Sequence, residues 1–121
     1  MRLIKNPPRE MQGATVAQVT FSEAGDFGAV GAAEYRGIPV FSPKGVAYRP
    51  SEGDNLLILP VDGVDACIGT LAFTEGLKAG ELRLTSAGGA KIWLKNNGDV
   101  VINDVVITKS GELIPPGQGG T

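Results

Sequence analysis

Few side chains in this chain of 121 residues are able to perform catalysis. It has no histidine and one cysteine, Cys67, so composition excludes histidine-based triads, Cys/His pairs and His-containing zinc sites. Two carboxylate pairs, Asp62 with Asp65 and Glu75 with Glu81, could serve a glycosidase, which needs two carboxylates across a cleft. Turn and linker chemistry explains all of them at least as well. We therefore expect no enzyme, catalytic residue or cofactor, and a small hydrolase has the least support.

Three other features have ordinary explanations. The glycine-rich stretch 117–120 lacks the lysine, the preceding strand and the following helix that a phosphate-binding loop requires. Trp93 could stack on a base or a sugar, although a strand tryptophan more often packs against protein. Cys67 lies in an apolar stretch and has no intrachain disulfide partner, so we expect it to be a small buried side chain.

Composition favours many short strands. Glycine contributes 18 residues and proline 8, which suits tight turns, and we predict an all-β fold with little or no helix. A net charge of −2 and a pI near 5.0 argue against a surface that neutralises phosphates, so no nucleic-acid partner is expected. No stretch matches a signal peptide or the ~20 apolar residues of a membrane span, and we expect a product that is soluble where it is made.

The hydrophobic pattern divides the chain into four segments. Residues 1–12 are polar and interrupted by prolines, which predicts an extended arm. About five strands are expected in residues 13–75, as in a small OB-fold barrel. The strand ranges that the pattern predicts are 14–22, 29–35, 38–41, 46–48, 56–59 and 66–73. Residues 76–114 form the next segment, and 115–121 are a Gly/Pro-rich tip or tail.

Shorter strands alternating with turns characterise residues 76–114. Strands are predicted at 81–85, 91–95, 99–103 and 105–108, separated by turns at Gly88-Gly89, Asn97-Gly98 and Asn103-Asp104 and closed by Ser110-Gly111. Apolar residues alternate with polar ones, with Trp93 and Val101 as exceptions. One face is therefore apolar and the other polar. The predicted apolar face consists of Leu82, Leu84, Ile92, Leu94, Val100 and Ile102.

This segment needs a partner surface. Strands of about five residues span only ~17 Å, and one layer of them leaves an apolar face and two edges exposed. Three identical copies whose apolar faces meet on one axis would cover this face in a three-sided β-prism, with the six residues above as the trimer core. The competing interpretation is that these strands pack onto the first domain of the same chain, giving a larger monomeric sandwich.

Three stretches carry a resemblance to a known family. They run from Gly53 to Gly63, from Gly80 to Ser86 and from Gly88 to Val100. Over about residues 13–114 the chain resembles the baseplate assembly protein V family, the central spikes of Mu-like contractile phages, tailocins and prophage particles. The resemblance implies an OB-fold barrel that closes the tail tube and docks to hub proteins. It also implies an intertwined trimeric β-helix that leads the particle into the target cell envelope.

The chain departs from that family at its end. Family spikes often finish in a His-x-His apex that binds iron, whereas this chain has no histidine, so we expect no apical metal. The short spike fits a separate tip protein, or a host without an outer membrane. Assembly in the host cytoplasm and residence in the tail baseplate are implied. The alternative is a monomeric OB-type module that binds an oligosaccharide or single-stranded nucleic acid.

Overall fold

The computed structural model of the chain describes residues 13–117. These residues form ten strands and no helix, which confirms the predicted all-β class, and they include no helix of the length and hydropathy of a membrane span. The chain divides into two compact units, Met1–Ala72 and Phe73–Thr121. The sequence analysis placed this boundary between residues 75 and 76. The expected arm, residues 1–12, and positions 118–121 of the tail lie outside the described residues.

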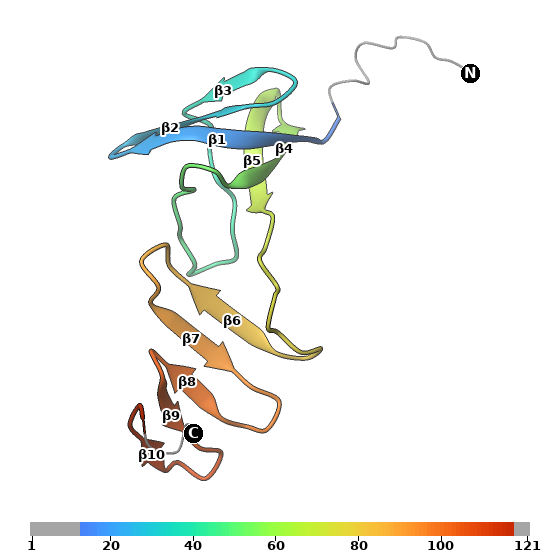
Figure 1. Cartoon of the computed structure of the whole chain (residues 1–121). Coiled ribbons are helices and arrows are strands. Elements are labelled where there is room, and N and C mark those ends of the chain that lie inside the picture. The colour runs from blue at the N-terminus through green and yellow to red at the C-terminus, as the bar shows by residue number, and fades with distance from the viewer. Residues whose placement is uncertain (1–12, 118–121) are drawn as a thin grey trace, which may run out of the picture. The chain divides into compact units, whose positions relative to one another are not determined.

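The first unit is a five-stranded antiparallel sheet with the strand order β3-β2-β1-β4-β5 (Figure 1). Its strands are β1 (Thr15–Glu23), β2 (Asp26–Val30), β3 (Glu34–Arg36), β4 (Asn55–Val61) and β5 (Val64–Thr70). The longest strand, β1, pairs with β2 through one half and with β4 through the other. It therefore joins the two halves of the sheet.

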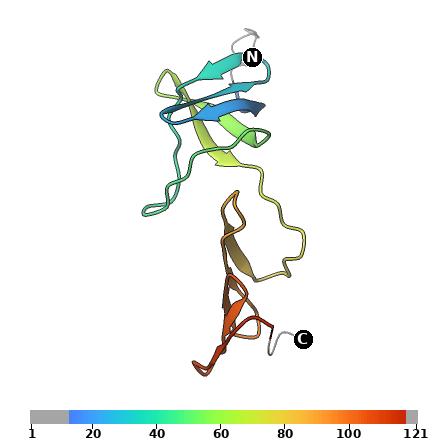
Figure 2. The same ribbon diagram turned by 60° about the vertical axis from the view of Figure 1, so that its left-hand side comes forward.

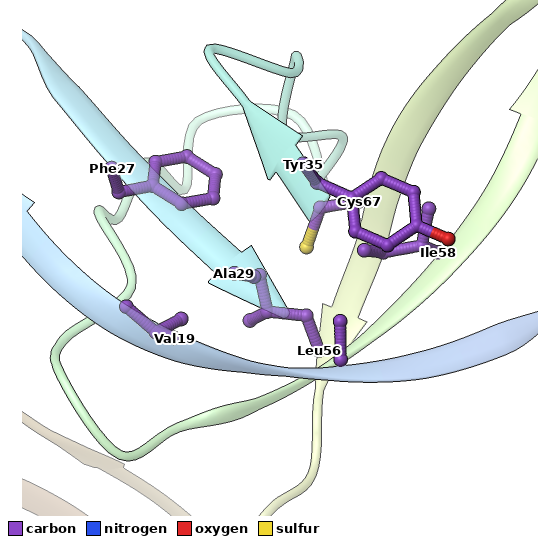
Figure 3. Packing of buried hydrophobic residues seen from close by; sticks show 8 residues of the cluster. Val19, Phe27, Ala29, Tyr35, Leu56, Ile58 and Cys67 are labelled. Carbon is purple, nitrogen blue, oxygen red and sulfur yellow. The ribbon is translucent and has the colours of Figure 1, made fainter. Parts of the chain in front are cut away.

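Alternating side chains of this sheet form the core (Figure 3). The core residues are Ala17, Val19, Phe27, Ala29, Tyr35, Leu56, Ile58 and Cys67. The most completely buried of the large side chains, Leu56 and Ile58, come from β4. Each buried aliphatic side chain contributes ~1.5–3 kcal/mol to folding. Cys67 is free and buried among them, as its apolar flanks predicted.

The segment after β3 returns to the opposite edge of the sheet. Val40 forms a parallel bridge with Cys67, whose backbone N–H donates to Pro39 O and whose carbonyl accepts from Phe41 N–H. The expected strand at 38–41 is reduced to this bridge. The expected strand at 46–48 is absent, because Val46 N–H closes a turn with Pro43 O instead of pairing with a strand.

The expected strand 29–35 is two strands, β2 and β3, joined by a tight turn. Gly31 N–H donates to Ala33 O at 2.9 Å within this turn. A Cβ at Gly31 would lie 2.5 Å from Val16 O, so only glycine fits beside β1 here. The turn consists of small apolar residues without a strong turn signal, which is why the sequence pattern did not mark it.

The second unit is also a five-stranded antiparallel sheet, with the order β10-β9-β8-β7-β6. Its strands are β6 (Leu82–Thr85), β7 (Lys91–Leu94), β8 (Val100–Ile102), β9 (Val105–Ile107) and β10 (Leu113–Ile114). Every strand pairs with its sequence neighbour, so the unit is a meander in a single layer (Figures 1 and 2). The strand β10 was not predicted.

Turn residues set the register of this meander. Asn103 and Asp104 have φ values of 49° and 74°, and Ile102 pairs with Val105 across them, which describes a two-residue type I′ hairpin. Gly89 occupies a turn with φ of 95°. The predicted turns therefore lie where the sequence placed them, and they hold the strands in one register.

Two adjacent glycines allow a direct test of this backbone requirement. Gly89 has a left-handed φ and Gly88 does not, while an added Cβ has no heavy atom closer than 4.0 Å at either position. We predict that Gly89→Ala destabilises the second unit by about 1–2 kcal/mol. Gly88→Ala should be neutral or mildly stabilising. Urea unfolding followed through the single tryptophan measures both, and equal effects of the two variants would contradict the assigned turn.

Candidate assembly surface

Strand register gathers the predicted trimer-core residues onto one face of the second sheet. Residues directly opposite on antiparallel strands share a face. Leu82 lies opposite Leu94, and Leu94 opposite Val100; in the neighbouring row, Leu84 lies opposite Ile92, and Ile92 opposite Ile102. The same pairing extends the rows into the later strands. We call the complete set the aliphatic face: Leu82, Leu84, Ile92, Leu94, Val100, Ile102, Val105, Ile107 and Leu113.

Most of the aliphatic face is exposed within the residues that the structure describes. The exposed fractions of Leu82, Leu84, Ile92, Leu94 and Ile102 lie between 40% and 54%. Leu113 is still more exposed, whereas Val100, Val105 and Ile107 are half-buried. A continuous apolar patch of this kind is unusual on a monomeric soluble protein and marks an interaction surface.

Sequence reasoning missed the last three members of this face. Val105, Ile107 and Leu113 follow the Asn103-Asp104 turn, and the run Val105-Val106-Ile107 is apolar at every position. Because such a run shows no alternation of apolar and polar residues, the sequence pattern cannot assign its residues to a face. The usable signal is the turn, because a two-residue hairpin places the residue before it and the residue after it on the same face.

The opposite face is centred on Trp93, and we call it the tryptophan face. Its central row consists of Arg83, Trp93, Val101, Val106 and Ile114. Trp93 and Val101, the two exceptions to the predicted alternation, are therefore cross-strand neighbours. Val101 is buried, with an exposed fraction of 9%. Trp93, Val106 and Ile114 are half-buried, so this row is less exposed than the aliphatic face.

Cations surround the Trp93 ring. The charged groups of Lys95, Arg83 and Lys91 lie 4.8, 5.3 and 6.0 Å from the ring centroid, within cation–π range. The Arg83 guanidinium also donates to the carbonyls of Phe73 and Glu75. The long stems of these side chains cover apolar surface while their charges remain in water.

Glu81 connects this face to the neighbouring turns. Its carboxylate accepts hydrogen bonds from Asn96 N–H at 3.1 Å, Lys78 N–H at 3.2 Å and Trp93 Nε1–H at 3.1 Å. These donors, Asn96 first, lower the pKa of Glu81 below its ordinary value by stabilising the carboxylate. Glu81 is thereby explained by structure, and nothing pairs it with Glu75 across a cleft.

The other carboxylate pair also lies in a turn. Asp62 has a φ of 51° in the two-residue hairpin between β4 and β5, and Asp65 lies opposite Pro60 just beyond it. Within residues 13–117, His, Cys, Asp and Glu side chains nowhere gather in groups of three or more that could hold a metal ion.

The first unit has one polar hollow of interest. It has a volume of about 450 Å³, and Asp26, Tyr48 and Arg49 line it beside apolar residues. The Tyr48 hydroxyl accepts from Thr70 Oγ1–H at 3.0 Å, and burial raises the pKa of this phenol. These groups could bind a polar ligand such as a sugar.

No protein-family model, curated protein or solved structure matches the chain.

The lowered pKa of Glu81 has a consequence for stability in acid. The contribution of a carboxyl whose pKa is lower in the folded state is complete above its unfolded pKa and is lost as the pH falls through the folded value. We predict that the second unit loses stability below about pH 4.5, and that Glu81→Gln removes part of this dependence. Thermal unfolding from pH 7 to pH 3, monitored by Trp93 fluorescence, measures the slope. Glu112→Gln controls for the loss of one charge; an unchanged slope in Glu81→Gln contradicts the assignment.

Proposed function

We propose that this chain is a structural, non-enzymatic protein that works as a homotrimer, in which three second units close around their aliphatic faces. The difference between the two faces of the second sheet carries the proposal. On the tryptophan face, cationic side chains of the sheet surround Trp93 and Val101 is buried, whereas the aliphatic face leaves large apolar groups in water. A single layer of short strands needs such a face covered to be stable.

The narrowness of the sheet favours three copies over two. Its strands are only two to four residues long, so each sheet presents just two aliphatic rows. Two such sheets stacked face to face leave both long sides of the shared core open to water. Three sheets related by a three-fold axis close into a three-sided β-prism without an open side. The turns would then lie at the corners, where a Cβ added at Gly89 meets no heavy atom within 4 Å, so this turn leaves room for a neighbouring copy.

Each wall of the prism would come from one chain, since the second unit is a continuous meander. The five strands stack over about 19 Å at the usual spacing of ~4.8 Å. Right-handed strand twist would wind the three walls about one another, and in this sense the chains would be intertwined. Moving one wall by one residue would expose its aliphatic rows and break several hydrogen bonds together. Stiffness along the axis is the property proposed here.

The biological role we propose is the central spike of a contractile phage or phage-like baseplate. The first unit would be the OB-fold barrel that closes the tail tube and contacts hub and tube proteins. Its five strands and the bridge between Val40 and Cys67, which draws opposite edges of the sheet together, support a small barrel. The prism would lead penetration of the target envelope, alone or beneath a separate tip protein, after assembly in the host cytoplasm.

The oligomeric state tests the proposal directly. Light scattering after size exclusion should give a mass about three times the chain mass of 12.5 kDa. Leu94→Asp should reduce this to one chain, because it places charges together on the axis, where no partner offsets their desolvation. Thr85→Asp introduces the same charge on the opposite face and should remain trimeric. A dimeric or monomeric wild-type protein, or a trimeric Leu94→Asp variant, defeats the proposal.

The role in a particle has its own test. In a cell that produces contractile particles with this chain, replacing it by Leu94→Asp should reduce assembled baseplates at least tenfold, as counted by negative-stain electron microscopy. Thr85→Asp should assemble normally. A full yield of baseplates carrying the Leu94→Asp protein would separate the chain from baseplate assembly even if the wild-type protein is trimeric.

The polar hollow of the first unit supports a second candidate, a monomeric OB-type module that binds an oligosaccharide. Tyr48 offers an aromatic ring, and Asp26 and Arg49 offer hydrogen-bonding groups. This candidate leaves the aliphatic face unexplained, so we rank it lower. A monomeric mass together with saturable binding of an oligosaccharide library, abolished by Tyr48→Ala, would favour it.

A further inference from the structure

The first unit also has an apolar surface that its own side chains leave open. A hollow of about 530 Å³ lies on the outer side of β1, β4 and β5, and its apolar lining includes Val16, Leu57 and Leu71. The exposed fractions of Val16 and Leu71 are 59% and 76%. Gly69 lies opposite Leu57, which in turn lies opposite Val16. The missing side chain at Gly69 therefore creates the hollow in an otherwise apolar row.

We infer that this hollow receives the apolar pair Leu3-Ile4 from the N-terminal segment of a second copy of the chain. The inference rests on the proposed trimer and adds a contact at the level of the first unit. Leu3 and Ile4 are adjacent and are the two branched aliphatic residues of segment 1–12. The hollow is of a size to bury aliphatic side chains, at ~1.5–3 kcal/mol each.

Charge favours the same pairing. The segment 1–12 carries Arg2, Lys5 and Arg9 against one carboxylate, Glu10, whereas residues 13–72 carry seven carboxylates and three cations. The lining of the hollow contains no charged residue, and Asp54, next to its lining residue Asn55, accepts a hydrogen bond from Ser51 N–H; the charge argument therefore concerns the first unit as a whole. A basic segment beside an acidic surface associates faster and with a preferred orientation.

The position at which the segment joins the first unit favours a neighbour over the same chain. Ile4 lies nine residues before Gly13, about 30 Å along extended backbone, and Pro7 and Pro8 favour extended conformations. Val16, at the hollow, is only three residues beyond Gly13, about 10 Å. A segment that keeps the extended conformation favoured by its prolines would carry Ile4 well past the hollow of its own chain. A second copy, held close by the trimer, lies within reach.

Disulfide cross-linking in the full chain tests this contact. The double variant Ile4→Cys with Leu57→Cys should form a covalent trimer on a non-reducing gel after mild oxidation, because each chain links to the next around the ring. Cys67 is fully buried and should not compete. The control pairs Ile4→Cys with Glu23→Cys, an exposed residue at the other end of β1, and should give at least tenfold less covalent trimer. Products confined to one chain, or equal linking in the control, overturn the inference.

Filling the hollow is the second test. A Cβ added at Gly69 meets no heavy atom within 4 Å, and its φ is not left-handed, so Gly69→Val should fold and suit a strand. Added to the Ile4→Cys, Leu57→Cys chain, it should reduce cross-linking at least tenfold. Undiminished cross-linking in this variant overturns the inference.

Light scattering on the reduced samples separates the two ideas. A trimer that fails to cross-link leaves the proposed function standing and removes only the inferred contact. A monomer under reducing conditions contradicts the trimer and, with it, this contact.

Discussion

The second unit depends on one constraint: a single layer of short strands has two faces. Within residues 13–117 the aliphatic face is the more exposed of the two. On the tryptophan face, cationic side chains surround the Trp93 ring, and the Glu81 carboxylate accepts a hydrogen bond from its indole N–H at 3.1 Å. On the aliphatic face, branched side chains lie in cross-strand rows and are largely exposed within residues 13–117. Because hydrophobic burial is the main source of folding free energy, burying the aliphatic face against another surface would stabilise the second unit.

Much of this face could be predicted from the sequence, because alternation is the strongest signal of a half-buried strand. Residues Leu82 to Ile102 alternate through turns that glycine and asparagine mark clearly. Beyond Asn103 the signal fails: Val105, Val106 and Ile107 are all apolar, and only the hairpin register assigns them to faces. The strand β10 has two residues, too few for any periodicity.

The first unit was harder to predict for a different reason. The strand predictions for the first unit are wrong where tertiary contacts override the local sequence pattern. At Gly31, an added Cβ would lie 2.5 Å from Val16 O, so the turn there depends on a contact with β1 that the apolar run 29–33 does not reveal. The residues after β3 are also apolar, yet they bridge β5 only at Val40. Such contacts join residues that are far apart in the sequence, so a pattern taken over neighbouring residues cannot predict them.

The aliphatic face and the hollow at Gly69 differ in how much of the structure each of them supports. The aliphatic face is continuous across five strands, so losing its cover would leave an entire sheet unsupported. The hollow at Gly69 interrupts a sheet whose core is already complete on its other side, with Leu56 and Ile58 buried there. In the proposed trimer, covering the hollow would therefore add stability to a unit that has its own core, whereas covering the aliphatic face would support the whole second sheet. Under this proposal, association should begin at the second unit, and contacts at the first unit should follow once the copies are held together.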